Sequence, residues 1–554
     1  MEVQQQSFLG GMNQLADDTA LAEDEYRLLI NARQRYGEVI PNKTSVQISG
    51  LRTGTNYQGA VAVGNTLIAF VDGRAYYRVP NTETWIRISD FLMDVTARKF
   101  WTCSVQKSTQ DYVRKRNDTL NNPIILNTDF NISGTPAGLV VQDGLNQPWL
   151  IEFNAVSQTF IARQTKTYAQ WANQSVTAND REYVPIGKQM FVLNQKLFIV
   201  APDGKSLYQS VTGRPLDFMV NVDNNGNKLA NAIAGGAASV SFAFDSDEIT
   251  YVKETNITDT FVYATKRYVR LITLNYNQTI LGEPTYQRAQ IIEAGVVNDE
   301  AFVDNLGDFV FVDNDGIKSF NAVANYRVEG RNSIFSAQID KLLQDRVQTA
   351  DQVATVSFDN YVLCYCNSIL GKCIAVYDSL RQKWISLDIT SLTDIKQFVR
   401  FANGLVDELY AVTDSGLFKL YAGDEREWGQ IHIRSIMPEN LQAEHKGAFI
   451  KPIFRGATIN GTLRVVEYVD EQLSQRQDRN MRESVMAMTW PLYFPIGFNS
   501  KPNAINSTIN FDKGLIGKKL AYVILWNTDA ALNGLRIVTS DCDPQAATRQ
   551  TAGS

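Results

Sequence analysis

The feature that most constrains the fold is a recurring turn motif in which a glycine is followed four residues later by an aromatic or apolar residue. Such turns favour residues that tolerate positive φ, and they connect adjacent antiparallel strands. Each copy follows a short run rich in β-branched and aromatic residues, as strands require. The copies pair Gly73 with Tyr77, Gly204 with Tyr208, Gly316 with Phe320, and Gly416 with Leu420. A loose repeat of short hairpins predicts a β-propeller.

The repeat is most complete over residues 59–90, where the turns Gly64-Asn65 and Asp72-Gly73 separate strand-like runs. Weaker copies predict further blades at 137–165, 185–220, 239–275, 290–329, 352–389 and 394–423. We therefore expect an all-β fold in which residues 55–425 form a β-propeller of about six or seven irregular blades with inserted loops. Longer strands predict a C-terminal β-sandwich-like domain over residues 426–554.

Residues 1–54 precede the predicted blades, and we expect them to form an N-terminal arm and a helix. The helix is predicted over about residues 21–35. Acidic Glu23, Asp24 and Glu25 would lie in its first turn and basic Arg33 and Arg35 in its last, which suits the helix dipole. The segment before it can bury little apolar surface alone. We expect it to pack on the C-terminal domain, a neighbouring copy or another protein.

Composition places the chain among ordinary globular proteins with more than one domain, since it has 554 residues, 44% of them hydrophobic, and a formal charge of −6. No apolar run approaches the roughly 20 residues that a membrane-spanning helix needs, and we expect no secretory leader. Of the five cysteines, Cys364, Cys366 and Cys373 lie in and just after one strand-like run. Their spacing fits a zinc site poorly, so buried free thiols in a reducing cytoplasm are the prediction.

Residues for catalysis are scarce, because His432 and His445 are the only histidines. This argues against a Ser-His-Asp triad or a histidine-rich metal site. Acidic turns such as Asp313–Gly316 do not match a calcium loop. We predict no catalytic, cofactor-binding or metal-binding residue. Paired carboxylates of the glycosidase kind stay open, because 59 acidic residues could form such pairs by chance.

The N-terminal stretch resembles the start of virion tail proteins of short-tailed, podovirus-like bacteriophages. The shared residues are Gly10-Gly11-Met12-Asn13, Glu25 before Leu28-Leu29, Asn31-Ala32-Arg33, and Gly37. Together with the predicted order of domains, this opening is similar to the tail nozzle proteins, also called tail tubular protein B or packaged-DNA stabilisation proteins, which have relatives in crAss-like phages.

The resemblance implies a structural protein without catalytic residues. It implies a homohexameric ring at the distal end of a short tail, which continues and closes the DNA channel and opens for genome ejection. The implied partners are further copies of the chain, other tail proteins such as the tube or adaptor and the fibres, and duplex DNA that passes without specific binding. The implied location is the virion tail, after assembly in the cytoplasm of the bacterial host.

Two groups of residues are the candidate sites. The candidate assembly arm contains Phe8, Gly10, Gly11, Asn13, Glu25, Asn31 and Arg33. A predicted loop, Gln472–Arg482, is a candidate for the channel bore or for an exposed tip that meets the host surface, and its basic residues are Arg476, Arg479 and Arg482. An excess of 59 acidic over 53 basic residues suits a channel through which DNA slides, because phosphate binding needs clustered Lys and Arg.

Two alternatives belong to other functional classes. A propeller can carry an enzyme site or a lectin site that binds carbohydrate. A tail protein can also bind the host receptor, although receptor-binding spikes usually show short-period β-helix repeats, which this sequence lacks. The mass of the protein in solution, or images of rings with an open bore, would separate these possibilities.

Overall fold

Turn residues divide the chain into short strands that pair mainly with their neighbours in sequence. The computed structural model describes the chain except for residues 1, 6–7, 36–37, 106–137, 155–156, 168–182, 211–214, 217, 219–237, 242–246, 281–282, 322–334, 344–352, 393, 436–446, 458–460, 482–504, 509–514, 518, 528–530 and 541–554. Within the described part the protein is mostly β, as predicted, and is built from many small antiparallel sheets.

Five small sheets follow one another along the chain, each a meander of neighbouring strands. The first sheet contains β7 (Tyr57–Val63), β8 (Thr66–Val71), β9 (Arg74–Arg78) and β10 (Trp85–Arg87); the second β11 (Trp101–Val105), β12 (Gly138–Gln142), β13 (Trp149–Asn154) and β14 (Thr159–Gln164); the third β15 (Met190–Leu193), β16 (Lys196–Val200), β17 (Ser206–Gln209) and β18 (Ala238–Ser241); the fourth β19 (Tyr251–Glu254), β20 (Thr260–Ala264), β21 (Val269–Ile280) and β22 (Glu283–Ile292); and the fifth β23 (Phe302–Asn305), β24 (Asp308–Asp313) and β25 (Gly316–Ser319).

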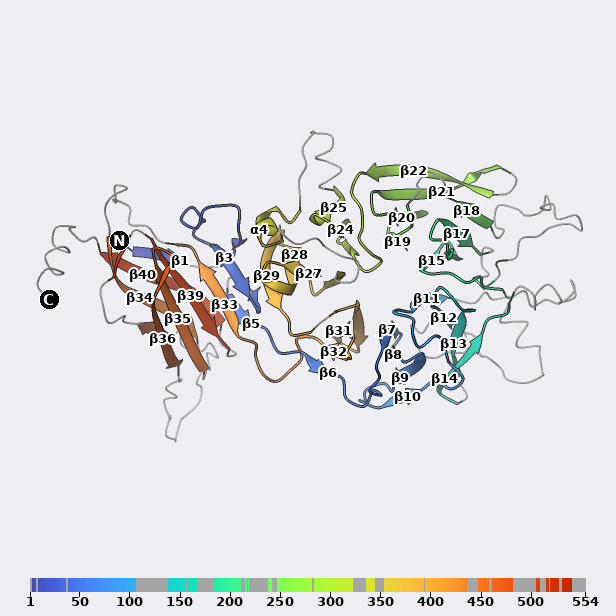
Figure 1. Ribbon diagram of the computed structural model, residues 1–554, viewed down its shortest axis with the longest axis horizontal. Coiled ribbons are helices and arrows are strands. Elements are labelled where there is room, and N and C mark those ends of the chain that lie inside the picture. Colours follow the sequence, from blue (N-terminus) through green and yellow to red (C-terminus); the bar gives the residue numbers. More distant parts are fainter. Residues whose placement is uncertain are drawn as a thin grey trace, which may run out of the picture.

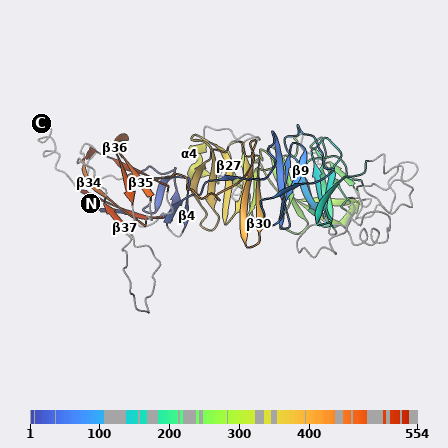
Figure 2. The ribbon, with the colours of Figure 1, turned by 90° about the horizontal axis from the view of Figure 1, so that it is seen from below.

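Two further small sheets complete the series. The sixth contains β26 (Ala354–Phe358), β27 (Tyr361–Ser368), β28 (Gly371–Asp378) and β29 (Lys383–Ile389), and the seventh contains β30 (Gln397–Asn403), β31 (Val406–Val412), β32 (Leu417–Lys419) and β6 (Val46–Gln47). The sheets follow one another around a ring (Figure 1), and β30 of the seventh sheet contacts β7 of the first. The view turned by 90° shows a flat, elongated molecule in which β9, β27 and β30 cross the thickness of the ring (Figure 2).

Packing of each small sheet between two neighbours explains the long apolar runs. All six residues of β8 are buried. Ile68 and Phe70 pack with residues of the second sheet, whereas Leu67 and Ala69 pack with residues of the seventh. Because successive residues of a strand point to opposite faces, a strand buried on both faces reads as a continuous apolar run instead of an alternating one.

The hairpin turn at Asp72-Gly73 is confirmed. Asp72 has φ 49° and Gly73 has φ 73°, which is the left-handed pair that a two-residue hairpin turn requires. A Cβ atom at Gly73 would lie 2.4 Å from the carbonyl oxygen of Met93, so glycine is also required by space. This turn holds the connection between the first and second sheets.

The two ends of the chain meet beside the ring in two larger sheets (Figure 1). The N-terminal strands are β1 (Glu2–Gln5), β2 (Gly11–Met12), β3 (Glu25–Ile30), β4 (Ala32–Arg35) and β5 (Glu38–Pro41); the C-terminal strands are β33 (Gly429–Ile433), β34 (Gly447–Ala457), β35 (Gly461–Val469), β36 (Gln472–Met481), β37 (Ile505–Thr508), β38 (Leu515–Gly517), β39 (Leu520–Trp526) and β40 (Ala531–Ser540). One sheet has the order β37-β34-β40-β5-β4, with β1 on β40 and β38 on β34. The other continues the sixth small sheet as β29-β3-β33-β39-β35-β36, with β2 on β3.

The predicted helix over residues 21–35 is wrong, because β3 and β4 occupy most of that range. The backbone of β3 pairs antiparallel with β33 and parallel with β29, and these partners override the local charge pattern. Asn31, at φ 52°, separates the two strands. Described helical residues lie instead at 320–321, in η2 (Ala337–Ile339) and in α4 (Asp340–Leu343), and none of the described helices is long and apolar enough to cross a membrane.

The predicted strand boundaries need three corrections. β11 lies in the stretch 91–136, between the first two predicted blades, and β18 starts at the end of the stretch 221–238, between the third and fourth predicted blades. The last strand of the seventh sheet, β6, comes from the N-terminal region expected to be an arm. The prediction of buried free thiols is confirmed, since Cys364, Cys366 and Cys373 are buried and free.

Candidate functional site

The N-terminal motif residues gather at the junction between the ring and the C-terminal strands. β2 pairs in parallel with β3, which places Gly11 beside Glu25. The Asn13 side-chain amide donates to both carboxylate oxygens of Glu25, at 3.1 and 3.2 Å. Asn13 Oδ1 in turn accepts from the backbone N–H of Leu15 at 3.0 Å. These bonds fold the segment between β2 and β3 back along β3.

Both glycines of the motif are required by close approach of the backbone. A Cβ atom on Gly10 would lie 2.7 Å from the backbone carbon of Asp24. Gly11 has φ 81°, and a Cβ atom there would lie 3.0 Å from the carbonyl oxygen of Trp384 on β29. Any larger residue at either position would push β2 away from β3 or β29.

Phe8 and Tyr26 anchor the junction through a buried ring pair. Both side chains are fully buried, and their rings meet edge to face with centroids 6.2 Å apart. The Tyr26 hydroxyl donates to the carbonyl oxygen of Ile385 on β29 at 2.8 Å. The N-terminal segment is therefore attached to the sixth sheet by side chains as well as by the backbone.

Arg33 is the most strongly held residue of the motif. One of its guanidinium nitrogens lies 2.6 Å from a carboxylate oxygen of Asp388, and its carbon lies 4.7 Å from the ring centre of Tyr421. The Tyr421 hydroxyl donates to the same carboxylate at 2.9 Å. Burial disfavours the charged guanidinium, but Asp388 outweighs this effect and raises the pKa of Arg33. Arg33 therefore links β4 to the sixth and seventh sheets as a permanent cation.

The structure brings Phe8, Gly10, Gly11, Asn13 and Glu25 together, and it places Asn31 and Arg33 just beyond the same strand, β3. These residues join parts of one chain. Their role in the assembly of several copies stays a prediction.

The second candidate group lies elsewhere, at the edge of the ten-stranded sheet. Residues 472–481 form strand β36 and not a loop, because they pair with β35 through the hairpin turn at Asp470-Glu471. Arg476 is exposed opposite Val466, and Arg479 lies opposite Leu463. Arg482 lies outside the described residues. A role of these arginines in a bore or at a tip stays a prediction.

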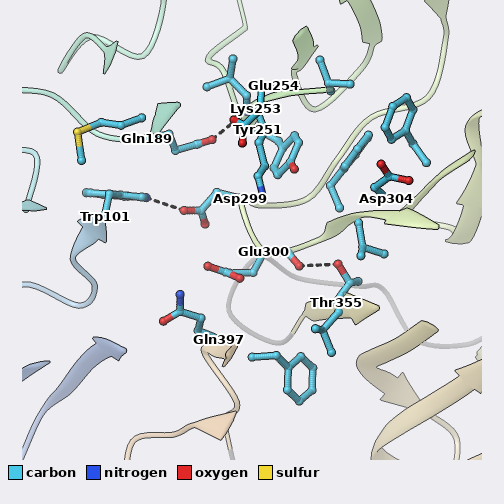
Figure 3. Close-up of a pocket in the computed structure, with 18 of the residues that line it drawn as sticks. Trp101, Gln189, Tyr251, Lys253, Glu254, Asp299, Glu300, Asp304, Thr355 and Gln397 are labelled. Atoms are coloured by element: carbon cyan, nitrogen blue, oxygen red, sulfur yellow. Dashed lines mark hydrogen bonds between the residues drawn. The ribbon is translucent and has the colours of Figure 1, made fainter. Parts of the chain in front are cut away.

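Sequence reasoning missed a cavity of about 660 Å³ at the centre of the ring. The first strands of several small sheets, and residues just before those strands, line it (Figure 3). Lys99, before β11, lies 2.7 Å from Asp299 and 2.5 Å from Glu300, both before β23. The indole N–H of Trp101 donates to the same oxygen of Asp299 at 2.5 Å. This cluster ties the second sheet to the fifth across the cavity.

The charges of this cluster are largely shielded from water. Burial disfavours the ammonium of Lys99, but Asp299 and Glu300 outweigh it and raise the pKa of Lys99 well above its usual value. Burial raises the pKa of Glu300, and Lys99 opposes that effect. The backbone carbonyl of Glu300 also accepts from the N–H and hydroxyl of Thr355, at 2.7 and 2.8 Å, which extends the link to the sixth sheet.

Glutamine side chains make similar links between neighbouring sheets, on either side of the acidic pair in Figure 3. The Gln189 amide donates to the carbonyl of Thr250 at 2.8 Å and accepts from the N–H of Val252 at 2.9 Å. Gln397 accepts from the N–H of Ala60 at 3.1 Å and so links the seventh sheet to the first. No spacing in the sequence indicated these contacts, because their partners lie on different sheets.

The acidic pair of the cavity, Asp299 and Glu300, is bound by Lys99 and Trp101. Among the described residues, no group of three or more His, Cys, Asp or Glu is placed to hold a metal ion. What the arrangement does is hold sheets together across the centre of the ring.

A scan against protein-family models and a search of curated proteins found no match to this chain.

Proposed function

We propose that this chain is a structural protein of the tail of a short-tailed bacteriophage, in the role of a tail nozzle. In this role several copies, six by resemblance to that family, form a ring that continues and closes the DNA channel and opens for genome ejection. The observation that carries the proposal is the N-terminal motif. Its Gly10, Gly11, Asn13, Glu25 and Arg33 each make a specific contact where the ring of small sheets joins the C-terminal strands.

The finer fold assignment is part of the proposal. The seven small sheets are proposed to be the blades of a β-propeller, with the first strand of each blade innermost. The pairing of β6 with β32 supports this, because an N-terminal strand that completes the last sheet closes the ring. The strands from β33 to β40, with β1, β4 and β5, are proposed to form a sandwich-like second domain.

A structural role is supported by the state of the buried charges. The acidic residues of the central cavity are engaged by Lys99 and Trp101, and the buried Asp388 is engaged by Arg33. An enzyme would instead need an acid or base whose proton can move to a substrate. These charges hold sheets together, which suits a part that must withstand force during ejection.

The proposed partners are further copies of the chain, the tube or adaptor and fibre proteins of the tail, and duplex DNA in transit. The proposed location is the virion tail, with assembly in the cytoplasm of the bacterial host. Each copy contributes −6 to the charge of the ring. A lumen of the same sign as DNA repels phosphates and lowers sliding friction.

Duplex DNA binding tests this part of the proposal. Affinity is measured for the assembled protein at low and at moderate salt. The proposal predicts weak binding with a shallow dependence on salt, since few phosphates are neutralised. Tight binding with a steep salt dependence would contradict it, because that slope reports many phosphate contacts.

A further inference from the structure

The small sheets all begin at one face of the ring. Lys99 and Asp299, which lie just before β11 and β23, are ion-paired, and Gln189 before β15 bonds to Thr250 before β19. We call this the start face. Because each sheet is an antiparallel meander, the turns after its first and third strands lie on the opposite side, the far face. In Figure 2 these two faces bound the thickness of the ring.

Contacts between turns place the sheets side by side on the far face. Ser379, in the turn between β28 and β29, donates its N–H to the carbonyl of Asn360 at 2.9 Å. The Ser379 hydroxyl also donates to the side-chain oxygen of Asn305, the last residue of β23 before the turn to β24, at 2.5 Å. The turns of the fifth and sixth sheets therefore form one continuous surface.

This surface carries exposed apolar side chains on four consecutive sheets, which we call the apolar arc. Its members are Ile257 on the fourth sheet, Leu306 on the fifth, Leu380 on the sixth, and Leu405 and Val406 on the seventh. By contrast, the corresponding turns of the first and third sheets carry Gly64-Asn65 and Asn194-Gln195. Single exposed apolar residues are common, but a series on neighbouring sheets indicates a contact surface.

Leu306 and Leu405 depart most clearly from what a turn requires. Leu306 is 75% exposed and has φ 53°, a conformation that costs a leucine about 1 kcal/mol. Leu405 is fully exposed at the tip of the hairpin between β30 and β31. Neither solvation nor local backbone preference favours leucine at these positions, so a partner surface is the remaining physical reason.

The arc carries exposed acidic residues. Asp304 is exposed two residues before Leu306, and the exposed Asp359 lines the same cavity as Leu380. Asp407, after Val406, is paired with the exposed Arg400 at 2.5 Å. A cavity of about 250 Å³ opens among these turns, and its lining residues are Gln34, Asp359, Asn360, Tyr361, Asp378, Leu380 and Arg381. The buried Gln34 amide nitrogen, which belongs to this lining, has no hydrogen-bond partner among the described residues. The unused N–H donor of Gln34 suits an acceptor oxygen from a partner.

A surface of the complementary kind lies on the start face, and we call it the basic patch. Exposed Leu92 and Val95 lie in the connection between β10 and β11, which is held by a bond from the N–H of Met93 to the carbonyl of Gly73 at 2.9 Å. The exposed charged residues around them are Arg52, Arg87 and Arg98, against Asp90. The patch is thus apolar with a basic surround.

We propose that the apolar arc of one copy packs on the basic patch of a second copy. The apolar tips would bury one another, and the arginines around the patch would face the acids of the arc. Since the two surfaces lie on opposite faces and on different sheets, the contact is head to tail, and a chain of such contacts closes into a ring when its rotation permits. This inference rests on the self-assembly in the proposed function and assigns it to two defined surfaces.

Two exposed double variants test the assignment. L306S/L405S damages only the arc, and L92S/V95S damages only the patch. In sedimentation velocity, each variant alone is expected to be monomeric where the wild type forms larger assemblies. An equimolar mixture is expected to form a dimer and nothing larger, because only one intact arc can meet one intact patch. I369S/L370S, on the turn between β27 and β28, is the matched control and should assemble as the wild type does.

Charge reversal gives an independent readout. D359R and R98E should each weaken self-association by about tenfold or more, most strongly at low salt. A mixture of the two variants should regain assembly if the head-to-tail pairing is correct, because the intact arc of R98E can meet the intact patch of D359R. The melting temperature, measured by circular dichroism, should be the same in all variants and the wild type, because every altered side chain is solvent-exposed or half-buried.

The outcomes separate this inference from the proposed function. If the wild type assembles and both leucine variants assemble equally well, the surfaces are wrong while the ring survives. If the wild type forms rings but the mixture of variants yields no dimer, the head-to-tail pairing is wrong. If the wild type stays monomeric at its highest soluble concentration, self-assembly through these surfaces is overturned together with the proposed ring.

Discussion

Lys99 shows how one side chain can join sheets that are far apart in sequence. It lies 2.7 Å from Asp299 and 2.5 Å from Glu300, and all three side chains are largely buried. Replacing it leaves two neighbouring carboxylates without a counter-ion in a poorly solvated site. Removing one partner from such a group costs more than the pair contributes, because the remaining charge is stranded.

We therefore expect Lys99→Met to lower the free energy of unfolding by about 3 kcal/mol. Urea unfolding, followed by fluorescence, measures this loss. Lys253→Met is the matched control, because Lys253 lines the same cavity but is exposed. An equal effect in both variants would show that the ion pair contributes nothing special to stability.

Glu467 on β35 gives the C-terminal strands a dependence on pH. Its carboxyl group is almost completely buried, and the Tyr522 hydroxyl donates to it at 3.0 Å. Burial raises the pKa of Glu467 to about 7, although the bond from Tyr522 favours the charged form. Between its ordinary value and about 7, the folded protein keeps a proton that the unfolded chain releases. Stability is therefore highest at acidic pH and falls as the pH rises through about 7.

The variant Glu467→Gln should remove this dependence while keeping an acceptor for Tyr522. Between about pH 5 and pH 8 the wild type should lose about 2 kcal/mol more stability than the variant. Burial lowers the pKa of His432 to about 4, which makes stability rise with pH over part of this range. His432 is present in both proteins, so the difference between their urea unfolding curves isolates Glu467. If the free energy of unfolding changes with pH by the same amount in both proteins, Glu467 ionises as an ordinary carboxyl group does.

At the scale of elements, β3 decides how the N-terminal region behaves. It lies between β29 and β33 in the middle of the ten-stranded sheet, and its Leu28 and Leu29 are buried. The sequence predicts an arm that packs on another surface, and β3 packs inside its own sheet. A strand in this position cannot leave without exposing two sheet edges.

Deleting residues 1–36 should therefore yield aggregated protein or a clearly lower melting temperature. Deleting residues 1–5 removes only β1, whose one partner is β40, and is the milder control. Soluble yield and thermal unfolding measure both effects. A soluble 37–554 protein with an unchanged melting temperature would show that β3 is dispensable.

The elements that could be predicted are those with local causes. The turn at Asp72-Gly73 needs positive φ, and β8 needs a continuous apolar run, so both are visible in the sequence. The helix expected at 21–35 failed because the acids of its first turn serve other purposes, as when Glu25 accepts from Asn13. β11 and β6 were missed because short polar strands depend on partners elsewhere in the chain.

The candidate site residues also divide into those with a local sequence pattern and those that depend on distant partners. Residues of the N-terminal motif could be found because they form one short pattern, although their purpose as a junction could not. Lys99 and Asp299 could not be found, because an ion pair spanning 200 residues of sequence leaves no local pattern. Arg476 and Arg479 were recognised as a basic group but assigned to a loop, since β36 is polar and its partner β35 supplies the apolar face.

At the scale of the whole molecule, the part of the chain that the structure describes is a series of small antiparallel sheets, with the N-terminal and C-terminal strands beside it (Figure 1). The N-terminal segment contributes strands to both larger sheets and completes the seventh small sheet, so it ties the two halves together. The series of sheets has two distinct faces. It suits repeated placement around an axis, as the proposed tail ring requires.

The most direct test of that claim is electron microscopy of the purified full-length protein, combined with its mass in solution. The proposed function predicts closed rings with an open bore and a mass of about six chains. Uniform monomers without rings, together with specific binding or cleavage of a carbohydrate, would contradict it and favour the enzyme or lectin alternative.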